Sequence, residues 1–187
     1  MTFRAPSHLS NPLRRFARRL VPEGQPLVVE ALPLPESMPD EPWFSSGRAA
    51  QSLGGERVDG WSLEEWPGLA LRARFAACWR DPRGQFWNVL PEGRPPGFLP
   101  DPRRRFAGVP IPDQYHALSR DALLEDYLTL CQAAARADLD EPRGELLAGL
   151  RQRLEDWLAH GGRADQPCPC GSGRRYRNCC SRRVREA

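Results

Sequence analysis

Four of the chain's six cysteines lie in a short stretch near the carboxyl end, as Cys168, Cys170, Cys179 and Cys180. Thiolates bind zinc at about 2.3 Å in a tetrahedral shell, and two cysteine pairs at the ends of a short loop can reach one ion. Because so short a peptide buries little of its own, bound zinc, worth on the order of 10 kcal/mol or more, would supply its folding energy. Four cysteines leave no open coordination position, which predicts a structural zinc site and not a catalytic one.

The residues between the two cysteine pairs fit this prediction. Gly171 and Gly173 permit a tight turn with positive φ angles, which points backbone N–H groups at sulfur. Arg174, Arg175 and Arg177 are placed to offset the formal negative charge of four thiolates around one divalent ion. Disulfides and unrelated free thiols are the alternatives. Cysteines that are adjacent, or separated by one residue, form only strained disulfides, and nothing in the sequence marks a secreted protein.

The stretch PCPCGSGRRYRNCC at 167–180 resembles the SEC-C motif, the zinc-binding element at the carboxyl end of the bacterial preprotein translocase ATPase SecA and of many otherwise unrelated bacterial proteins. The resemblance covers residues 165–181, which we call the knuckle. It implies that the four cysteines are the zinc ligands, the last of them at a position where the family carries His or Cys. In SecA the motif is a recognition module for the SecB chaperone and the ribosome. The chain has no Walker A pattern and no helicase-sized core, so we expect a protein other than SecA.

A second set of short elements lies within residues 54–106: Gly54-Gly55, Gly60-Trp61, 75–79, the turn Asp81-Pro82-x-Gly84, 88–91 and 98–102. Together these elements more faintly resemble a stand-alone bacterial SEC-C family. That family is similar to papain-like enzymes in placing a cysteine before the double glycine, a histidine in the strand and an acid after the turn. Here no cysteine precedes Gly54, Ala76 stands at the histidine position, and Asn88 stands at the acid position. The resemblance therefore implies that papain-like catalysis cannot operate in this chain.

Composition excludes few functions. All 27 basic residues are arginine, which is typical of GC-rich codon usage, and the net charge of +3 favours no particular class of partner. No apolar run approaches the roughly 20 residues that span a bilayer, so we expect a cytoplasmic protein without membrane insertion. The 20 prolines predict long ordered loops and short strands, because each proline removes a backbone donor.

The chain is long enough for one sizeable domain and a small module. We predict an α+β fold: a small antiparallel sheet plus a helical pair, with a C-terminal zinc knuckle. The expected division is a loosely packed basic arm at 1–26, an α+β domain at 27–160 with the helical pair at 119–160, and a zinc-binding module with a basic tail at 161–187.

The clearest strand is predicted over 69–80, where apolar residues alternate with arginines in the period of two that a half-buried strand shows. The sequence Asp81-Pro-Arg-Gly84 predicts a type I turn that leads into a returning strand at 85–90. Shorter strands are expected within 27–34 and at 61–66. The segments 35–46 and 91–112 are expected to be loops.

Two helices are predicted after residue 118. Ser119 is the expected cap of the first, in which apolar residues recur every three or four positions. Asp140, Glu141 and Pro142 are expected to open the second, which Gly161 and the following glycine end. A short connection at 137–142 predicts an antiparallel helix pair.

The remaining candidate residues favour structural roles. Cys78 and Cys131 are expected to be buried, and His116 to lie at a helix entry or on the surface. We therefore expect a non-enzymatic adaptor whose knuckle, with its three arginines, binds a protein or ribosomal surface. The alternatives are a hydrolase or transferase in the sheet domain that uses Cys78 or His116, and a nucleic-acid-binding protein that uses both basic ends, with RNA as a partner.

Overall fold

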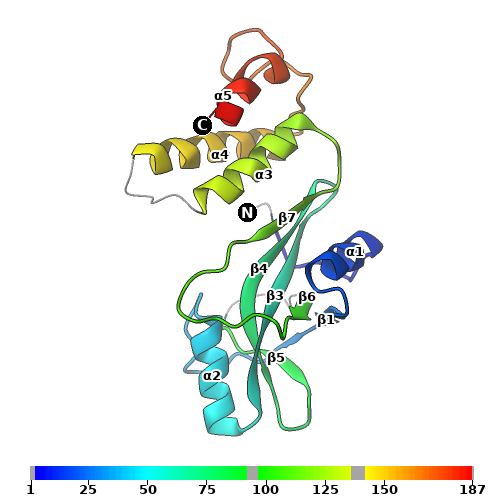
Figure 1. The fold of residues 1–187 in the computed structure, drawn as a ribbon, viewed down its shortest axis with the longest axis vertical. Coiled ribbons are helices and arrows are strands. Elements are labelled where there is room, and N and C mark those ends of the chain that lie inside the picture. Colours follow the sequence, from blue (N-terminus) through cyan, green and yellow to red (C-terminus); the bar gives the residue numbers. More distant parts are fainter. Residues whose placement is uncertain (1–2, 92–96, 136–141, 187) are drawn as a thin grey trace. The chain divides into compact units, whose positions relative to one another are not determined.

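The computed structural model describes residues 3–91, 97–135 and 142–186. Contacts divide these residues into two compact units. The sheet unit comprises Phe3–Trp66 and Leu71–His116, and the helical unit comprises Pro67–Ala70 and residues 117–186. Figure 1 shows the strands of the first unit and the paired helices of the second. Within the described residues, every helix is too short or too polar to cross a membrane.

The sheet contains seven strands in the order β1-β6-β3-β4-β5-β2, with β7 paired to β4. The strands are β1 (Leu27–Val28), β2 (Glu30–Ala31), β3 (Glu56–Trp66), β4 (Ala70–Arg80), β5 (Phe86–Asn88), β6 (Gly97–Pro100) and β7 (Gln114–Ala117). Only Val29 separates β1 from β2, the two ends of this order, so the sheet curls round into a near-barrel. The small antiparallel sheet expected from the sequence was wrong, since the near-barrel has seven strands and β2 pairs parallel with β5. Five of the strands have only two to four residues, too few for a hydrophobic pattern to predict them.

The predicted hairpin is confirmed in β4 and β5, which pair antiparallel with Trp79 opposite Trp87. The Gly84 N–H donates to the Asp81 carbonyl at 2.9 Å, and Gly84 has a φ of 86°. The Asp81 carboxylate fixes the turn further, since it accepts the backbone N–H of Arg83 at 2.9 Å and the Trp87 indole N–H at 3.1 Å. The local turn chemistry therefore determines the pairing of these two strands.

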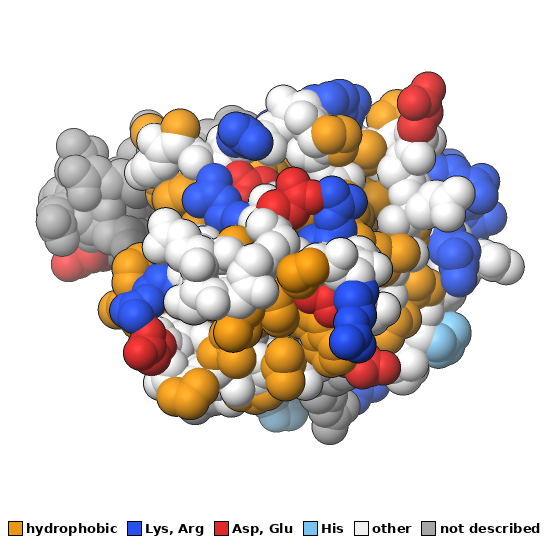
Figure 2. Space-filling model, turned by 90° about the horizontal axis from the view of Figure 1, so that it is seen from below, with side chains coloured by type: hydrophobic (Ala, Val, Ile, Leu, Met, Phe, Trp, Pro, Cys, Tyr) orange, Lys and Arg blue, Asp and Glu red, His pale blue; other side chains and the backbone are white. Residues whose placement is uncertain are grey.

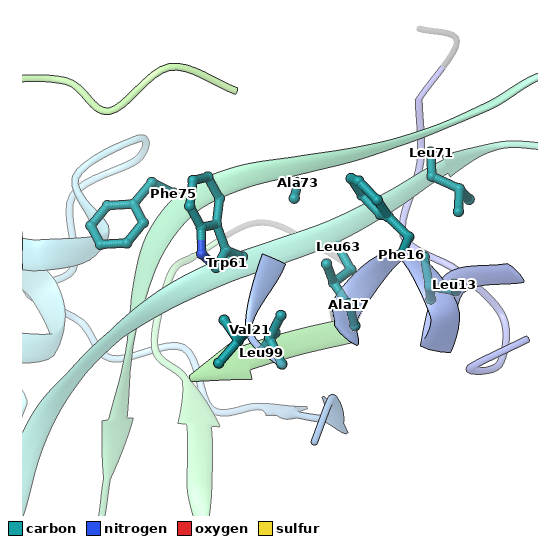
Figure 3. Packing of buried hydrophobic residues seen from close by; sticks show 10 residues of the cluster. All are labelled: Leu13, Phe16, Ala17, Val21, Trp61, Leu63, Leu71, Ala73, Phe75 and Leu99. Atoms are coloured by element: carbon teal, nitrogen blue, oxygen red, sulfur yellow. The ribbon is translucent and has the colours of Figure 1, made fainter. Parts of the chain in front are cut away.

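The core of the sheet unit lies between β3, β4, β6 and helix α1 (Asn11–Leu20), as Figure 3 shows. Leu13 and Ala17 of α1 are fully buried, and the Phe16 ring is 4% exposed. Ser10 caps the helix by accepting the Leu13 N–H at 3.4 Å. The expected loosely packed arm at 1–26 is thus corrected: its helix has one apolar side, and that side supplies part of the core.

The first five residues of helix α2 (Pro42–Leu53) lie where the sequence predicted a loop over 35–46. Its Trp43 ring stacks on Phe106 with centroids 3.9 Å apart. At its end, Gly55 has a φ of 80°, and a Cβ there would lie 2.1 Å from the Arg80 carbonyl oxygen. Glycine is therefore required where the chain passes from α2 into β3. Strand β6 also replaces part of a predicted loop, with Leu99 fully buried.

The helical unit contains α3 (Ala122–Ala134), α4 (Pro142–Ala159), the 3₁₀ turn η1 (Tyr176–Asn178) and α5 (Cys180–Glu186). Figure 1 shows α3 and α4 running antiparallel, which confirms the predicted helix pair. The cap of α3 is Asp121, whose Oδ1 accepts the Leu123 N–H at 2.9 Å, and the prediction of Ser119 was wrong. The predicted connection and the opening residues 140–141 lie outside the described residues.

The contacts group the chain differently from the expected division. The helical pair and the knuckle belong to one unit, whereas that division separates them after residue 160. The physical reason is that buried side chains of the knuckle pack on α3 and α4, as described below. The helical pair and the knuckle are therefore treated together.

Candidate metal centre

The backbone of the knuckle forms a small hairpin that ends in η1. The Cys168 N–H donates to the Arg174 carbonyl at 2.7 Å, and Pro167 and Arg175 form an isolated antiparallel bridge. Gly171 and Gly173, between these strands, have φ angles of 79° and 70°. Residues with a side chain rarely adopt these angles, so the glycines allow the turn that was expected of them.

The turn brings the four predicted ligands together. The Sγ atoms of Cys168, Cys170, Cys179 and Cys180 all lie within 4.8 Å of one another. The Cys170 and Cys179 sulfurs are 3.5 Å apart, and all four cysteines are free of disulfides. Tetrahedral zinc–thiolate bonds of about 2.3 Å separate the sulfurs by roughly 3.8 Å. The donor set and its spacing therefore fit one tetrahedral metal ion.

Hydrogen bonds and burial shift the pKa values of three of these thiols in different directions. The Ser172 hydroxyl and backbone N–H, together with the neighbouring thiols, lower the pKa of Cys170 to about 6. Burial raises the pKa of Cys168, although the backbone N–H groups of Cys170 and Cys180 donate to its sulfur and oppose that rise. Burial also raises the pKa of Cys180 to about 12. Cys170 is thus the thiol whose pKa is lowered, and a metal ion that bound the sulfurs of Cys168 and Cys180 would displace their protons.

A buried aromatic ring anchors the knuckle to the helices. Tyr176 is fully buried, and its hydroxyl donates to Oδ2 of Asp126 on α3 at 3.0 Å. Its ring lies 5.6 Å from the Trp157 ring of α4, measured between centroids. Burial and the Asp126 charge raise the pKa of Tyr176, which keeps the phenol protonated as a donor. The ring thus orients the turn that carries the cysteines.

A second contact ties the chain entering the knuckle to the start of α3. Asp121, whose Oδ1 caps α3, accepts the Ala164 N–H through Oδ2 at 3.3 Å. On the far side of the cysteines, Ser181 and Val184 of α5 are buried at 2% and 4% exposure. The knuckle is therefore held on both flanks by packing within the helical unit.

Tyr176→Phe is expected to destabilise the helical unit by about 1–3 kcal/mol, because it removes one donor from a buried carboxylate. The same change is expected to speed zinc transfer to a colorimetric chelator, since the loosened turn releases the metal more often. Thr129→Ala serves as control: it removes an exposed hydroxyl of α3 and should change stability by no more than about 0.5 kcal/mol. Equal release rates for Tyr176→Phe and the wild type would contradict the anchoring role.

The arginines of the knuckle lie on its outer surface. Arg174, Arg175 and Arg177 are exposed, and Arg182 beyond them is exposed as well. Among the described residues, no carboxylate lies within ion-pair distance of these four guanidinium groups. One side of the knuckle is therefore packed on the helices, while the other presents positive charge to solvent.

The two cysteines outside the knuckle are buried, as expected. Cys78 is 3% exposed and packs with Val29 and Phe98 in a small apolar cluster. Burial raises its pKa to about 12, so the thiol stays protonated and is a poor nucleophile at neutral pH. Cys131 is 7% exposed on the apolar side of α3.

His116 lies on β7, in a different set of contacts from Cys78. Its ring stacks on Phe16 at 5.8 Å, and Arg19 Nη1 lies 3.3 Å from its Nδ1. Burial, followed by the charges of Arg19 and Arg15, lowers the pKa of His116. The described contacts do not join this imidazole to a nucleophile.

The two positions of the fainter papain-like resemblance have no catalytic chemistry here. Ala76 is half-buried on β4 and carries no titratable group. Asn88 is buried on β5, and its Oδ1 accepts the Leu90 N–H at 3.2 Å. The side chain of Asn88 therefore supports the backbone where the strand ends.

The sequence analysis missed Asp126 and the role of Tyr176. Asp126 is 4% exposed on α3, where its neighbours at helical spacing, Leu123 and Leu130, are fully buried or nearly so. An acid on the apolar side of a helix needs a buried donor. The position of Asp126 among apolar residues could therefore have indicated a buried hydrogen bond. Tyr176, between the two cysteine pairs, was a possible donor for it.

Comparison with known proteins identifies the knuckle. Residues 166–182 match the family model of the SEC-C motif. The match spans 17 of the 187 residues, so it identifies this motif and leaves the sheet unit and the helical pair unassigned. No curated protein and no solved structure matches the chain.

Proposed function

We propose that the four cysteines hold one structural Zn²⁺ ion, and that the knuckle so formed docks onto an acidic surface of another protein or of the ribosome. The observation that carries the proposal is the gathering of four sulfurs within 4.8 Å of one another in a matched SEC-C motif. The protein is then an adaptor and not an enzyme.

The donor set favours zinc over other cations. Four thiolates suit zinc, whereas calcium and magnesium take oxygen ligands. Because the protein would supply all four ligands, the ion would shape the fold and leave no position for a substrate or an activated water. The free cysteines also suit a reducing compartment, so we place the protein in the cytoplasm.

The exposed arginines favour a docking role. A rigid turn that presents Arg174, Arg175 and Arg177 on one side complements a surface rich in carboxylates or phosphates. Arginine suits such contacts because its planar guanidinium binds both groups through two parallel hydrogen bonds. Rim charges of this kind chiefly raise the association rate, which makes the interaction sensitive to salt.

The test is affinity capture with the zinc-loaded full chain and an Arg174→Glu/Arg175→Glu variant. The variant is expected to keep its zinc and to lose the captured proteins or ribosomes, because the metal ligands are untouched while the outer charge is reversed. Arg153→Glu is the control for charge reversal, since Arg153 is exposed on α4 outside the knuckle. Identical capture by the two charge-reversed proteins and the wild type would refute the docking role while leaving the zinc site standing.

A further inference from the structure

The outer side of α1 forms a second basic surface, separate from the knuckle. Burial of the apolar side of the helix leaves four arginines facing solvent, and all four are exposed: Arg14, Arg15, Arg18 and Arg19. The helix contains no acid, and its exposed positions hold these arginines and Asn11. The packing of α1 on the sheet therefore gathers four positive charges within less than two turns of the helix, between Arg14 and Arg19.

The loop after β6 extends this surface. Asp101 has a fully buried carboxylate that pairs with Arg103 at 3.1 Å and with Arg104 at 3.6 Å. The Arg103 guanidinium also donates to the carbonyl of Leu20, the last residue of α1. One buried acid thus holds two arginines at the end of the helix, and Arg105 is exposed beside them.

The surface is strongly charged for its size. We define the arginine face as the exposed arginines of α1 and of the loop: Arg14, Arg15, Arg18, Arg19, Arg103, Arg104 and Arg105. Of its seven arginines, Arg103 and Arg104 pair with Asp101, and Asp59 lies beside the loop, where it accepts the Phe106 N–H at 2.8 Å. Among the described residues, no carboxylate lies within ion-pair distance of the four α1 arginines.

Two further observations agree with an excess of positive charge here. Arg19 and Arg15 act with burial to lower the pKa of His116, whose ring lies against the helix. Figure 2 shows basic side chains gathered along the right-hand edge, the side on which α1 lies in Figure 1. A partner that binds this surface therefore contacts several arginines, most of which form no ion pair with a carboxylate of the described residues.

We propose that the arginine face binds the phosphate backbone of a nucleic acid without reading its bases. Guanidinium groups bind phosphate through paired hydrogen bonds. Arg14 and Arg18 form one row on the helix, and Arg15 and Arg19 form a second. The two arginines of each row are four residues apart, which is roughly 6 Å along the helix axis. A nucleic acid, whose phosphates are regularly spaced, can contact several of these arginines at once. The arginine face as defined consists of guanidinium groups, which bind phosphates, so the contacts carry no sequence information.

The buried side of α1 argues against a lipid partner. A helix that lies on a membrane inserts its apolar face between the headgroups. In α1 that face is already occupied, because Leu13, Phe16 and Ala17 are buried in the core of the sheet unit. The exposed positions of α1 are its four arginines and Asn11, so this side of the helix offers an acidic protein no apolar anchor.

The test measures fluorescence anisotropy of labelled single-stranded RNA and duplex DNA with the zinc-loaded full chain. If the four α1 arginines each release one counterion from single-stranded RNA, the slope of log K against log salt is about −3, and affinity falls about 50-fold between 50 and 200 mM salt. Arg15→Ala/Arg18→Ala is expected to halve that slope. These two side chains are exposed, so the fold should be kept.

The control variant is Arg83→Ala/Arg153→Ala, which changes the net charge equally at exposed positions on the hairpin and on α4. It is expected to bind RNA with the slope of the wild type. An equal loss in both double variants would overturn the proposal, as would binding abolished by Arg174→Ala/Arg175→Ala but unchanged by Arg15→Ala/Arg18→Ala. Binding to phosphatidylserine vesicles without binding to either nucleic acid would also overturn it and assign the surface to a membrane.

Discussion

Stripping the metal with a chelator is expected to unfold the knuckle while the sheet unit stays folded. Zinc bound by four thiolates contributes on the order of 10 kcal/mol, and a hairpin this short cannot replace that energy. The backbone bonds that define the knuckle, such as Cys168 N–H to Arg174 O and Tyr176 N–H to Gln166 O, should then break. Hydrogen exchange of these amides should reach the rate of an unstructured peptide, whereas amides of β3 and β4 should keep their protection.

The controls separate loss of metal from chemical damage. Cys170→Ser is expected to show the fast exchange before any chelator is added, and the chelator should change nothing further. Asn178→Ser, at an exposed position of η1, should behave like the wild type. If the knuckle amides remain protected after chelation, the knuckle is stable without metal. The prediction that zinc supplies its folding energy is then wrong.

Replacing Phe16 by alanine is expected to destabilise the sheet unit by about 3–5 kcal/mol. The ring is 4% exposed and lies in the core shared by α1, β3 and β4, so its removal loses apolar contacts and leaves a cavity. A side chain on a loosely packed arm would change stability by no more than about 0.5 kcal/mol. Urea unfolding followed by tryptophan fluorescence distinguishes these values.

The matched control lies on the other side of the same helix. Arg18→Ala removes an exposed side chain and replaces it with the best helix former, so it should leave the unfolding free energy within about 0.5 kcal/mol of the wild type. If Phe16→Ala and Arg18→Ala have the same small effect, α1 does not belong to the core.

The features that the sequence predicted correctly depend on local chemistry. The hairpin follows from Asp81 and Gly84 at fixed turn positions and from the alternation of β4. The clustering of the cysteines follows from their spacing around Gly171 and Gly173. In each case neighbours within about ten residues hold the information, so no knowledge of the remaining fold was needed.

The features that the sequence missed depend on distant contacts. In α1 the arginines suggested a solvated arm, but Leu13, Phe16 and Ala17 pack on strands that come some fifty residues later in the chain. Strand β6 has four residues, and its regular structure comes from pairing with β1 and β3. Tertiary pairing overrode the weak local propensity in these segments.

The candidate site shows the same division. The spacing of the cysteines was enough to predict that their sulfurs gather, yet it gave no reason to expect the knuckle to be packed on the helices. The buried pair of Tyr176 and Asp126 joins residues that are 50 positions apart. The buried carboxylate on α3 and the buried phenol of the knuckle satisfy each other's hydrogen bonding. The sequence around either residue alone therefore does not predict the contact.

Elemental analysis of the purified, reduced full chain tests the central claim most directly. The account predicts one zinc ion per chain in the wild type and none in Cys170→Ser, because the sulfurs of Cys168, Cys170, Cys179 and Cys180 form a single closed shell. A wild-type chain without zinc, or a Cys170→Ser variant that keeps its full complement, would contradict it.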